Sequence, residues 1–178
     1  MSASFAFAVF PTTLGDCGIA WSTRGVCGVQ LPEASVAVTR SRLQRRLGEG
    51  VESTPTAAVS EAIAGVQGLL RGEPLTLTEI VLDETALADF AHRVYEITRS
   101  ILPGATRTYG EIAAELGDPT AARAVGRALG QNPYPLIVPC HRVLAANSRV
   151  GGFSAYGGIT TKLRLLEIER RRVPFALS

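Results

Sequence analysis

A cysteine and a histidine stand side by side in this chain, at Cys140 and His141, directly after Pro139. The thiolate of a cysteine is a strong nucleophile, and a neighbouring base can generate it from the thiol. Three apolar residues, 136–138, precede the proline and predict a buried segment, so the thiol has a defined place. A cysteine here could also be a small buried hydrophobic residue, and a Cys-His pair alone does not separate the two interpretations.

A carboxylate that could serve this pair lies near the end of the chain, at Glu169. Residues 160–170 predict a helix whose apolar residues include Leu165 and Leu166. Because Glu169 follows these leucines by four and three positions, it projects toward the core face of the helix. A buried carboxylate needs a partner, which a histidine ring can supply. Glu167 lies off that face and is expected in solvent.

Two short helices in the second half form a helix-turn-helix pattern. Thr108 followed by Glu111 is a capping box, which opens a helix over 109–116. Asp118 then caps a second helix over 119–129, with a proline at its first position.

The second helix carries two arginines, Arg123 and Arg127, one turn apart and flanked by the small residues Ala122 and Gly126. Small residues beside arginines let a helix backbone approach a polyanion closely. Residues 86–178 also hold twelve basic and seven acidic side chains, whereas residues 1–85 hold six and nine. We therefore expect any DNA contact in the second half. The other interpretation is a solvated arginine-rich surface.

The elements that position these residues follow from the apolar pattern. The first half predicts strands and helices in mixed order: a strand over 5–10, a hairpin over 18–31, a helix over 36–47, a loop over 48–56, a helix over 57–70 and a strand over 75–82. From residue 83 the pattern becomes helical and begins with one long helix over 87–101. We expect two domains, 1–83 and 84–178.

Composition narrows the class of protein. Of 178 residues, 46% are hydrophobic and 19% charged, which excludes a disordered or coiled-coil chain. No apolar run is long enough to cross a bilayer, and no positive charge precedes the short apolar N-terminal stretch as in a secretory signal. Three cysteines exclude a disulfide scaffold, so we expect a cytoplasmic protein with no membrane partner.

The full string around the cysteine resembles the active-site signature of the O6-alkylguanine-DNA alkyltransferases, or methylated-DNA–protein-cysteine methyltransferases. The matching residues run in one order over roughly residues 86 to 170: Thr106–Ala113, Ala121–Gly126, Asn132-Pro133, Pro139-Cys140-His141-Arg142-Val143, Gly151-Gly152-Phe153, Gly157-Gly158, Lys162, Leu165-Leu166 and Glu169.

The resemblance implies that this protein repairs DNA by irreversible transfer of an alkyl group to Cys140. The group would come from O6-alkylguanine and also from O4-alkylthymine. The damaged base is flipped out of the duplex, because a stacked base cannot present its O6 substituent for in-line attack. His141 would take the thiol proton through a water, Glu169 would orient His141, and Asn132 would shape the turn at the site.

The resemblance also implies residues that contact DNA and the flipped base. Arg123 would fill the vacated stack and Tyr109 would crowd the 3′ phosphate; the expected DNA contacts are Tyr109, Ala122, Arg123, Gly126, Arg127 and Arg142. The expected pocket residues are Tyr109, Pro135, Val143, Ser154, Tyr156 and Gly157. The loop over 152–157 is longer than in many members, so Ser154 and Tyr156 both stay candidates for the contact with the guanine oxygen.

The fold that the resemblance implies is α+β. Its first domain would be a small antiparallel sheet with helices, ribonuclease-H-like, and its second a helical, winged-helix-like domain with a helix-turn-helix. We expect a monomer without cofactor or metal, since Cys17, Cys27 and His92 show no ligand-like spacing.

Three other classes are compatible with parts of the sequence. A lesion-binding protein without transfer activity would have another residue, typically tryptophan, in place of Cys140, and would usually lack the first domain. A helix-turn-helix transcription factor would leave residues 139–143 and Glu169 unexplained. A cysteine hydrolase would need turnover, so the mass of the protein after reaction separates it from a single-use acceptor.

Overall fold

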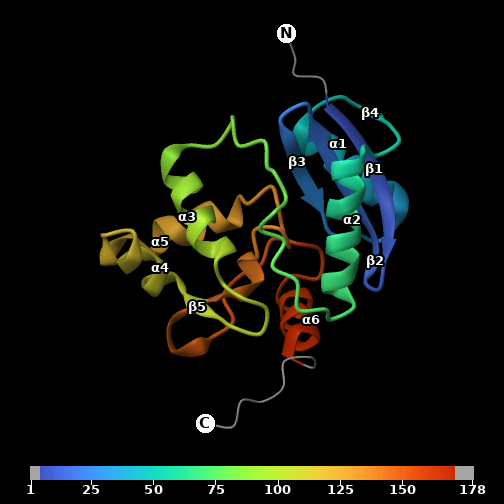
Figure 1. The fold of residues 1–178 in the computed structure, drawn as a ribbon. Coiled ribbons are helices and arrows are strands. Elements are labelled where there is room, and N and C mark those ends of the chain that lie inside the picture. The colour runs from blue at the N-terminus through green and yellow to red at the C-terminus, as the bar shows by residue number, and fades with distance from the viewer. Residues whose placement is uncertain (1–4, 171–178) are drawn as a thin grey trace.

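The computed structural model describes residues 5–170 of the chain. A four-stranded sheet in the order β3-β2-β1-β4 forms its first part (Figure 1). The strands are β1 (Phe5–Thr12), β2 (Gly15–Ser22), β3 (Gly25–Gln30) and β4 (Gly50–Glu52). The predicted hairpin over 18–31 is confirmed as β2 and β3, which pair antiparallel, as do β1 and β2.

β4 pairs in parallel with β1, so the sheet is mixed and the prediction of a purely antiparallel sheet is wrong. β4 also lies within the segment 48–56 that was predicted to be a loop. The helix α1 (Val36–Leu47) runs between β3 and β4, and a helical crossover returns the chain in the direction of the strand before it.

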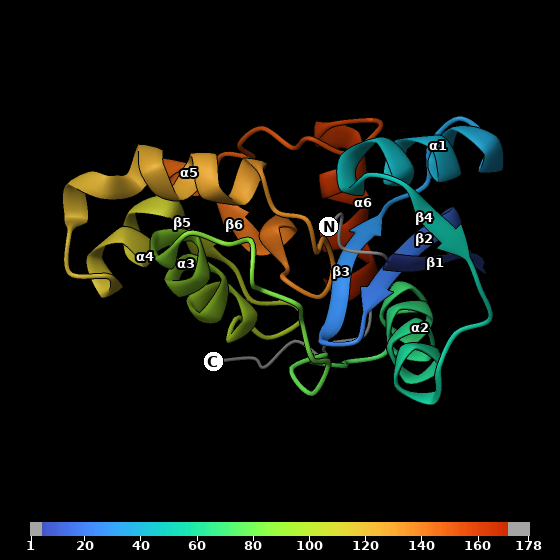
Figure 2. The same ribbon diagram turned by 90° about the horizontal axis from the view of Figure 1, so that it is seen from above.

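Two helices cover opposite faces of this sheet, α1 on one side and α2 (Ala57–Leu70) on the other (Figure 2). Side chains alternate along β1 accordingly. Phe5 and Phe7 pack with Leu43 of α1, whereas Ala8 and Phe10 join the larger apolar cluster that includes residues of α2. The predicted bounds of both helices are confirmed.

The predicted strand over 75–82 does not form. Only Leu82 makes a bridge, with Val26, and Leu77 has a φ of 56°, which a strand does not allow. The Arg99 guanidinium donates hydrogen bonds to three carbonyl oxygens of this segment at 2.9 to 3.1 Å. β3 bonds this segment only at its end, where the Val26 N–H donates to the Val81 carbonyl oxygen at 2.9 Å. Alternating polarity did not reveal that a side chain bonds three of the other carbonyl groups.

The second part is mainly helical. Its elements are α3 (Asp89–Arg99), β5 (Arg107–Thr108), α4 (Tyr109–Glu115), the 3₁₀ helix η1 (Pro119–Ala121), α5 (Ala122–Gly130), the 3₁₀ helix η2 (Cys140–Arg142), β6 (Val143–Leu144), the 3₁₀ helix η3 (Ala146–Ser148) and α6 (Ile159–Arg170). β5 and β6 pair in parallel. α3 is shorter than the predicted helix over 87–101, and none of the helices within residues 5–170 is long and apolar enough to cross a membrane.

The predicted capping box is confirmed: the Glu111 N–H donates to Thr108 Oγ1 at 3.1 Å, and Glu111 Oε2 accepts from the Thr108 N–H at 2.6 Å. The second predicted helix begins as η1 and continues as α5 after Asp118, which caps it. One apolar cluster extends from the sheet through α3, α4 and α5 to residues 136–138, so both parts of the chain share a core.

Candidate active site

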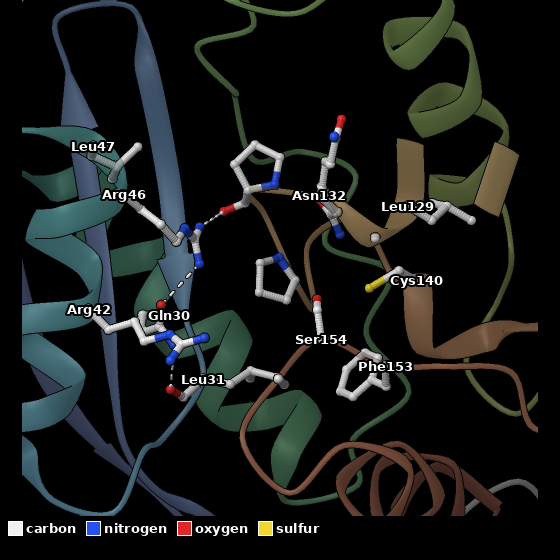
Figure 3. A pocket seen from close by; sticks show the side chains of 15 residues that line it. Gln30, Leu31, Arg42, Arg46, Leu47, Leu129, Asn132, Cys140, Phe153 and Ser154 are labelled. Carbon is white, nitrogen blue, oxygen red and sulfur yellow. Dashed lines mark hydrogen bonds between the residues drawn. The ribbon is translucent and has the colours of Figure 1, made fainter. Parts of the chain in front are cut away.

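Cys140 opens η2 and is 9% exposed, with its sulfur directed into a pocket of about 420 Å³ (Figure 3). The pocket lies between the first and second parts of the chain. Gln30, Leu31, Arg42, Arg46 and Leu47 line one side, and Leu129 to Pro133, Pro135, Cys140 and Phe153 to Ala155 line the other. A small substrate group could therefore reach the thiol, while η2 and the core enclose the rest of the residue.

His141 and Glu169 are both buried and bonded to each other, His141 Nε2 to Glu169 Oε1 at 2.8 Å. The expectation from helical spacing that Glu169 faces the core of α6 is confirmed. Glu167, on the same helix, is exposed as expected.

Arg142 is the third member of this buried cluster, at 1% exposure. Its guanidinium donates to Glu169 Oε1 at 2.7 Å from Nη2, and to the carbonyl oxygen of Ile101 at 2.6 Å from Nη1. From the resemblance, Arg142 was expected to contact DNA. In the structure it is directed inward, because the buried carboxylate needs a full positive charge beside it, so we withdraw that role.

The electrostatics of the cluster define its protonation state. Burial acts to raise the pKa of Glu169, but the hydrogen bonds from His141 and Arg142 and the charge of Arg142 outweigh it and lower that pKa to about 2. Burial lowers the pKa of His141 as well, so the ring is neutral at pH 7. Because an ionised Glu169 only accepts hydrogen bonds, we assign the His141 proton to Nε2.

That assignment leaves His141 Nδ1 as a buried basic nitrogen, and it has no hydrogen-bond partner among the described residues. Burial raises the pKa of Cys140, while the Asn132 side chain and the charge of Lys162 act to lower it. The resting pair is therefore a thiol beside a neutral imidazole, and the thiolate must form when substrate is present.

Lys162 is the residue that the sequence analysis left without a role. It is fully buried, its Nζ donates to the Val143 carbonyl oxygen at 2.6 Å, and it lies 5.8 Å from the centre of the Tyr109 ring. No carboxylate of the described residues is within ion-pair distance of it. Lys162 is the only lysine in a chain with seventeen arginines, so the composition alone could have marked it as a candidate site residue.

Asn132 organises the turn before the cysteine. Its Oδ1 accepts from the Tyr134 N–H and its Nδ2 donates to the Val138 carbonyl oxygen, both at 2.9 Å. The Cys140 N–H donates to the same Val138 oxygen at 2.8 Å. Leu136, inside the turn, has a φ of 74°, a conformation that costs a non-glycine residue about 1 kcal/mol or more and that surrounding contacts must maintain.

The expected DNA-contacting arginines lie on the exposed face of α5. Arg123 and Arg127 are both exposed, and neither forms a hydrogen bond or ion pair with any residue between 5 and 170. Ala122 and Gly126 are partly exposed beside them. Tyr109 begins α4, half-buried, and its pKa is raised by burial and by the nearby Cys140. The structure thus places a free cationic helix face and the candidate nucleophile in the same part of the chain.

The expected pocket residues divide into two groups. Pro135 and Ser154 line the pocket, whereas Tyr109, Val143, Tyr156 and Gly157 do not. Val143 is fully buried, and Tyr156 is 57% exposed on the loop before α6. The pocket residues from the first part of the chain were not predicted, because nothing in the local sequence indicates that α1 faces the cysteine.

Within residues 5–170, no three His, Cys, Asp or Glu side chains are grouped so that they could bind a metal ion. Cys17 is buried in the core, and His92 pairs with Glu84 at 3.0 Å.

Comparison with known proteins agrees with this geometry. Residues 89–171 match the family model described as 6-O-methylguanine DNA methyltransferase, DNA binding domain. A methylated-DNA–protein-cysteine methyltransferase of Mycobacterium bovis is 45% identical over 121 residues, which are 68% of this chain and 71% of the relative. One from Methanothermobacter thermautotrophicus is 32% identical over 154 residues, 86% of this chain and 79% of the relative. The crystal structure of Mycobacterium tuberculosis OGT in complex with DNA superposes with a TM-score of 0.75 at 32% identity, over 97% of this chain and 96% of that one.

Proposed function

Since this chain belongs to the methylated-DNA–protein-cysteine methyltransferase family, we propose that Cys140 is the residue that accepts the alkyl group. The protein acts in DNA repair by transferring an alkyl group from DNA to a protein cysteine. The assignment of Cys140 rests on one observation above all: its sulfur faces a pocket, and the buried His141–Glu169 pair lies beside it.

The substrate we propose is O6-alkylguanine in duplex DNA, with O4-alkylthymine as a second one. The sulfur attacks the alkyl carbon, an S–C bond forms, and the bond from that carbon to the guanine oxygen breaks. The thiol proton passes through a water to His141 Nδ1, and guanine receives a proton in exchange, so the reaction is balanced. The buried positive charge of Lys162 stabilises the thiolate as it forms.

The target base must leave the helix to reach this pocket, because a stacked guanine cannot present its substituent to a recessed thiol. We assign Arg123 to the gap left in the stack and Tyr109 to the 3′ phosphate. Arg127 would bind phosphate, and Ala122 and Gly126 would let the α5 backbone approach the groove. These contacts do not read sequence, which suits a repair protein.

For the flipped base, Pro135 and Ser154 form the wall that we expect it to contact, since both line the pocket of Cys140. Tyr156 and Gly157 lie on the same loop before α6, outside the lining, and would have to move inward to touch the base. We therefore propose that Ser154, and not Tyr156, contacts the guanine oxygen.

The finer architecture is also a proposal. We take residues 1–83 as a ribonuclease-H-like structural domain and residues 84–178 as a winged-helix-like domain that binds DNA and carries the acceptor. The helix-turn-helix of α4 and α5 supports the second part of this division. We further propose that the protein is a cytoplasmic monomer.

The proposed function predicts one repair event for each protein molecule. A thioether at Cys140 has no acidic proton and is a poor leaving group, so neither His141 nor Glu169 can regenerate the thiol. With O6-methylguanine duplex in excess, the time course should show a burst equal to the protein concentration and no steady state. Mass spectrometry should find one methyl group on the peptide that contains Cys140. Sustained turnover with unmodified Cys140 would indicate a hydrolase, and binding without modification a lesion-recognition protein.

Arg123→Ala should reduce repair of duplex DNA by about tenfold or more and leave transfer from free O6-benzylguanine nearly unchanged. The arginine is exposed on α5 and, in this proposal, acts on base flipping and not on the transfer itself. Both rates can be measured as alkylation of Cys140 over time. Arg45→Ala, which removes an exposed arginine of α1, serves as the control for lost charge. Equal losses on both substrates would place Arg123 in the fold or the pocket.

A further inference from the structure

Two donors from the first part of the chain bond one carbonyl group of the active-site turn, that of Pro133. This oxygen accepts a hydrogen bond from the Val29 N–H of β3 at 2.8 Å and another from Arg46 Nη2 of α1 at 3.0 Å. Both donors belong to the sheet and helix that carry none of the expected catalytic residues. We propose that Arg46 is a positioning residue, which fixes the turn at Asn132 and Pro133 and thereby the environment of Cys140.

Arg46 links its own helix, α1, to β3 and to the active-site turn, and all of its hydrogen-bond acceptors within residues 5–170 are uncharged oxygens. Besides Pro133, its guanidinium donates to Gln30 Oε1 at 3.0 Å (Figure 3). It also donates to the Val29 carbonyl oxygen at 3.3 Å. No carboxylate of the described residues is within ion-pair distance, in contrast to Arg42 one turn earlier, which pairs with Glu33 at 3.4 Å. A planar group with five donors is suited to such a junction, and hydrogen bonds from a charged donor are stronger than those between neutral groups.

The contacts continue without a break from Pro133 to the cysteine. Asn132, which precedes Pro133, donates to the Val138 carbonyl oxygen, and this oxygen also accepts a hydrogen bond from the Cys140 N–H. The Asn132 side chain also acts to lower the pKa of Cys140. Because Leu136 within the same turn has an unfavourable positive φ, the turn depends on outside contacts to keep its shape.

Gly28 supplies independent support for this junction. A Cβ atom at Gly28 would lie 3.0 Å from Leu47 Cδ1, 3.3 Å from the Pro133 oxygen and 3.6 Å from Arg46 Nη2. The absence of a side chain at this point of β3 is what allows the sheet, the arginine and the turn to approach so closely.

The test measures the thiol itself and needs no DNA. In wild type, Arg46→Met and Arg45→Met, the rate at which iodoacetamide labels Cys140 is followed by peptide mass over a range of pH, well below each melting temperature. Methionine keeps an unbranched stem and removes the guanidinium. If Arg46 positions Asn132, the midpoint for Arg46→Met should move up by about half a pH unit to one unit, which is a roughly three- to tenfold lower rate at pH 7. Arg45→Met, on the same helix and outside the pocket, should retain the wild-type profile.

Several other groups bear on this titration: His141 of η2, Lys162 of α6, Tyr95 of α3 and Tyr109 of α4. None of them is hydrogen-bonded to Arg46 in the part of the chain that the structure describes. Arg42 of α1 and Arg46 itself also line the pocket of Cys140, so their charges bear on the midpoint directly. Arg46→Lys keeps the charge and so separates its effect from that of the turn contacts. Its three N–H donors radiate from one nitrogen and do not match acceptors spread around a planar guanidinium, so it should give an intermediate profile. If Arg46→Met does not fold, the labelling profile of Arg46→Lys tests the proposal in its place.

An Arg46→Met profile identical to wild type would overturn the proposal, whether or not the melting temperature falls, since a lower melting temperature alone indicates a structural role. The inference rests on Cys140 being the acceptor, and the two can fail separately. Methyl transfer by wild type from an O6-methylguanine oligonucleotide tests the acceptor, whereas the labelling profile tests Arg46.

Discussion

Cys140→Ser should abolish alkyl transfer and leave binding to duplex DNA at its wild-type affinity. Serine has nearly the same size, so the pocket and the α5 surface should persist. Its hydroxyl, however, ionises far above neutral pH and is a much weaker nucleophile than a thiolate. We expect transfer to fall below about one-thousandth of the wild-type rate, measured as methyl loss from an O6-methylguanine duplex.

Cys27→Ser is the matched control, because Cys27 is partly exposed on β3 and outside the pocket of Cys140. This variant should transfer a methyl group at the wild-type rate. The assignment of Cys140 would be refuted by a mass increase of one methyl group on the Cys140→Ser protein, or by loss of activity in Cys27→Ser alone.

Glu169→Ala should have the largest effect on stability of any single substitution discussed for this protein. The carboxylate is the only anion beside the buried Arg142 guanidinium among the described residues, and it also accepts from His141. Its removal leaves a buried positive charge without a partner, which costs about 3–5 kcal/mol. For a chain of this length that corresponds to a melting temperature lower by roughly 10 °C. Glu167→Ala, on the exposed side of α6, should change it by less than about 2 °C.

The same substitution predicts a pH dependence with a definite sign. The pKa of Glu169 is about 2 in the folded protein and 4.5 as its ordinary value, so the ionised carboxyl favours the folded state. This stabilisation is fully present above pH 4.5 and is lost as the pH falls through about 2. The difference in unfolding free energy between wild type and Glu169→Ala should therefore be constant near neutral pH and shrink below pH 4.5. A difference that stayed constant down to pH 2 would contradict the charged cluster.

Transfer should also fall in Glu169→Gln, by about a hundredfold or more, because a neutral amide no longer makes His141 an effective base. Glutamine keeps the shape of the side chain, so this variant separates the catalytic effect from lost packing. The rate is measured with free O6-benzylguanine at a temperature at which the variant is folded. A wild-type rate would show that the His141–Glu169 pair is only structural.

The sequence by itself determined those features that depend on neighbours along the chain. The capping box of α4, the bounds of α2 and the buried face of α6 that carries Glu169 are all set by contacts within a few residues, and each was predicted correctly. The string from Pro139 to Val143 likewise indicated the family, because its residues are consecutive.

Only the tertiary structure decided what depends on segments far apart. β4 joins β1 in parallel because α1 returns the chain to the same direction. Residues 75–82 form no strand: Arg99 bonds the carbonyl groups of Leu77, Thr78 and Ile80, and only the end of the segment bridges β3. Whether a charged side chain is directed toward DNA or toward the core is equally a question of distant partners. Arg142 is buried because Glu169, 27 residues away, lies opposite it, and Arg46 reaches the pocket of Cys140 because β3 and the turn at Pro133 meet there. No local pattern carries that information, since the free energy of a buried charge depends on which charges and dipoles the fold places around it.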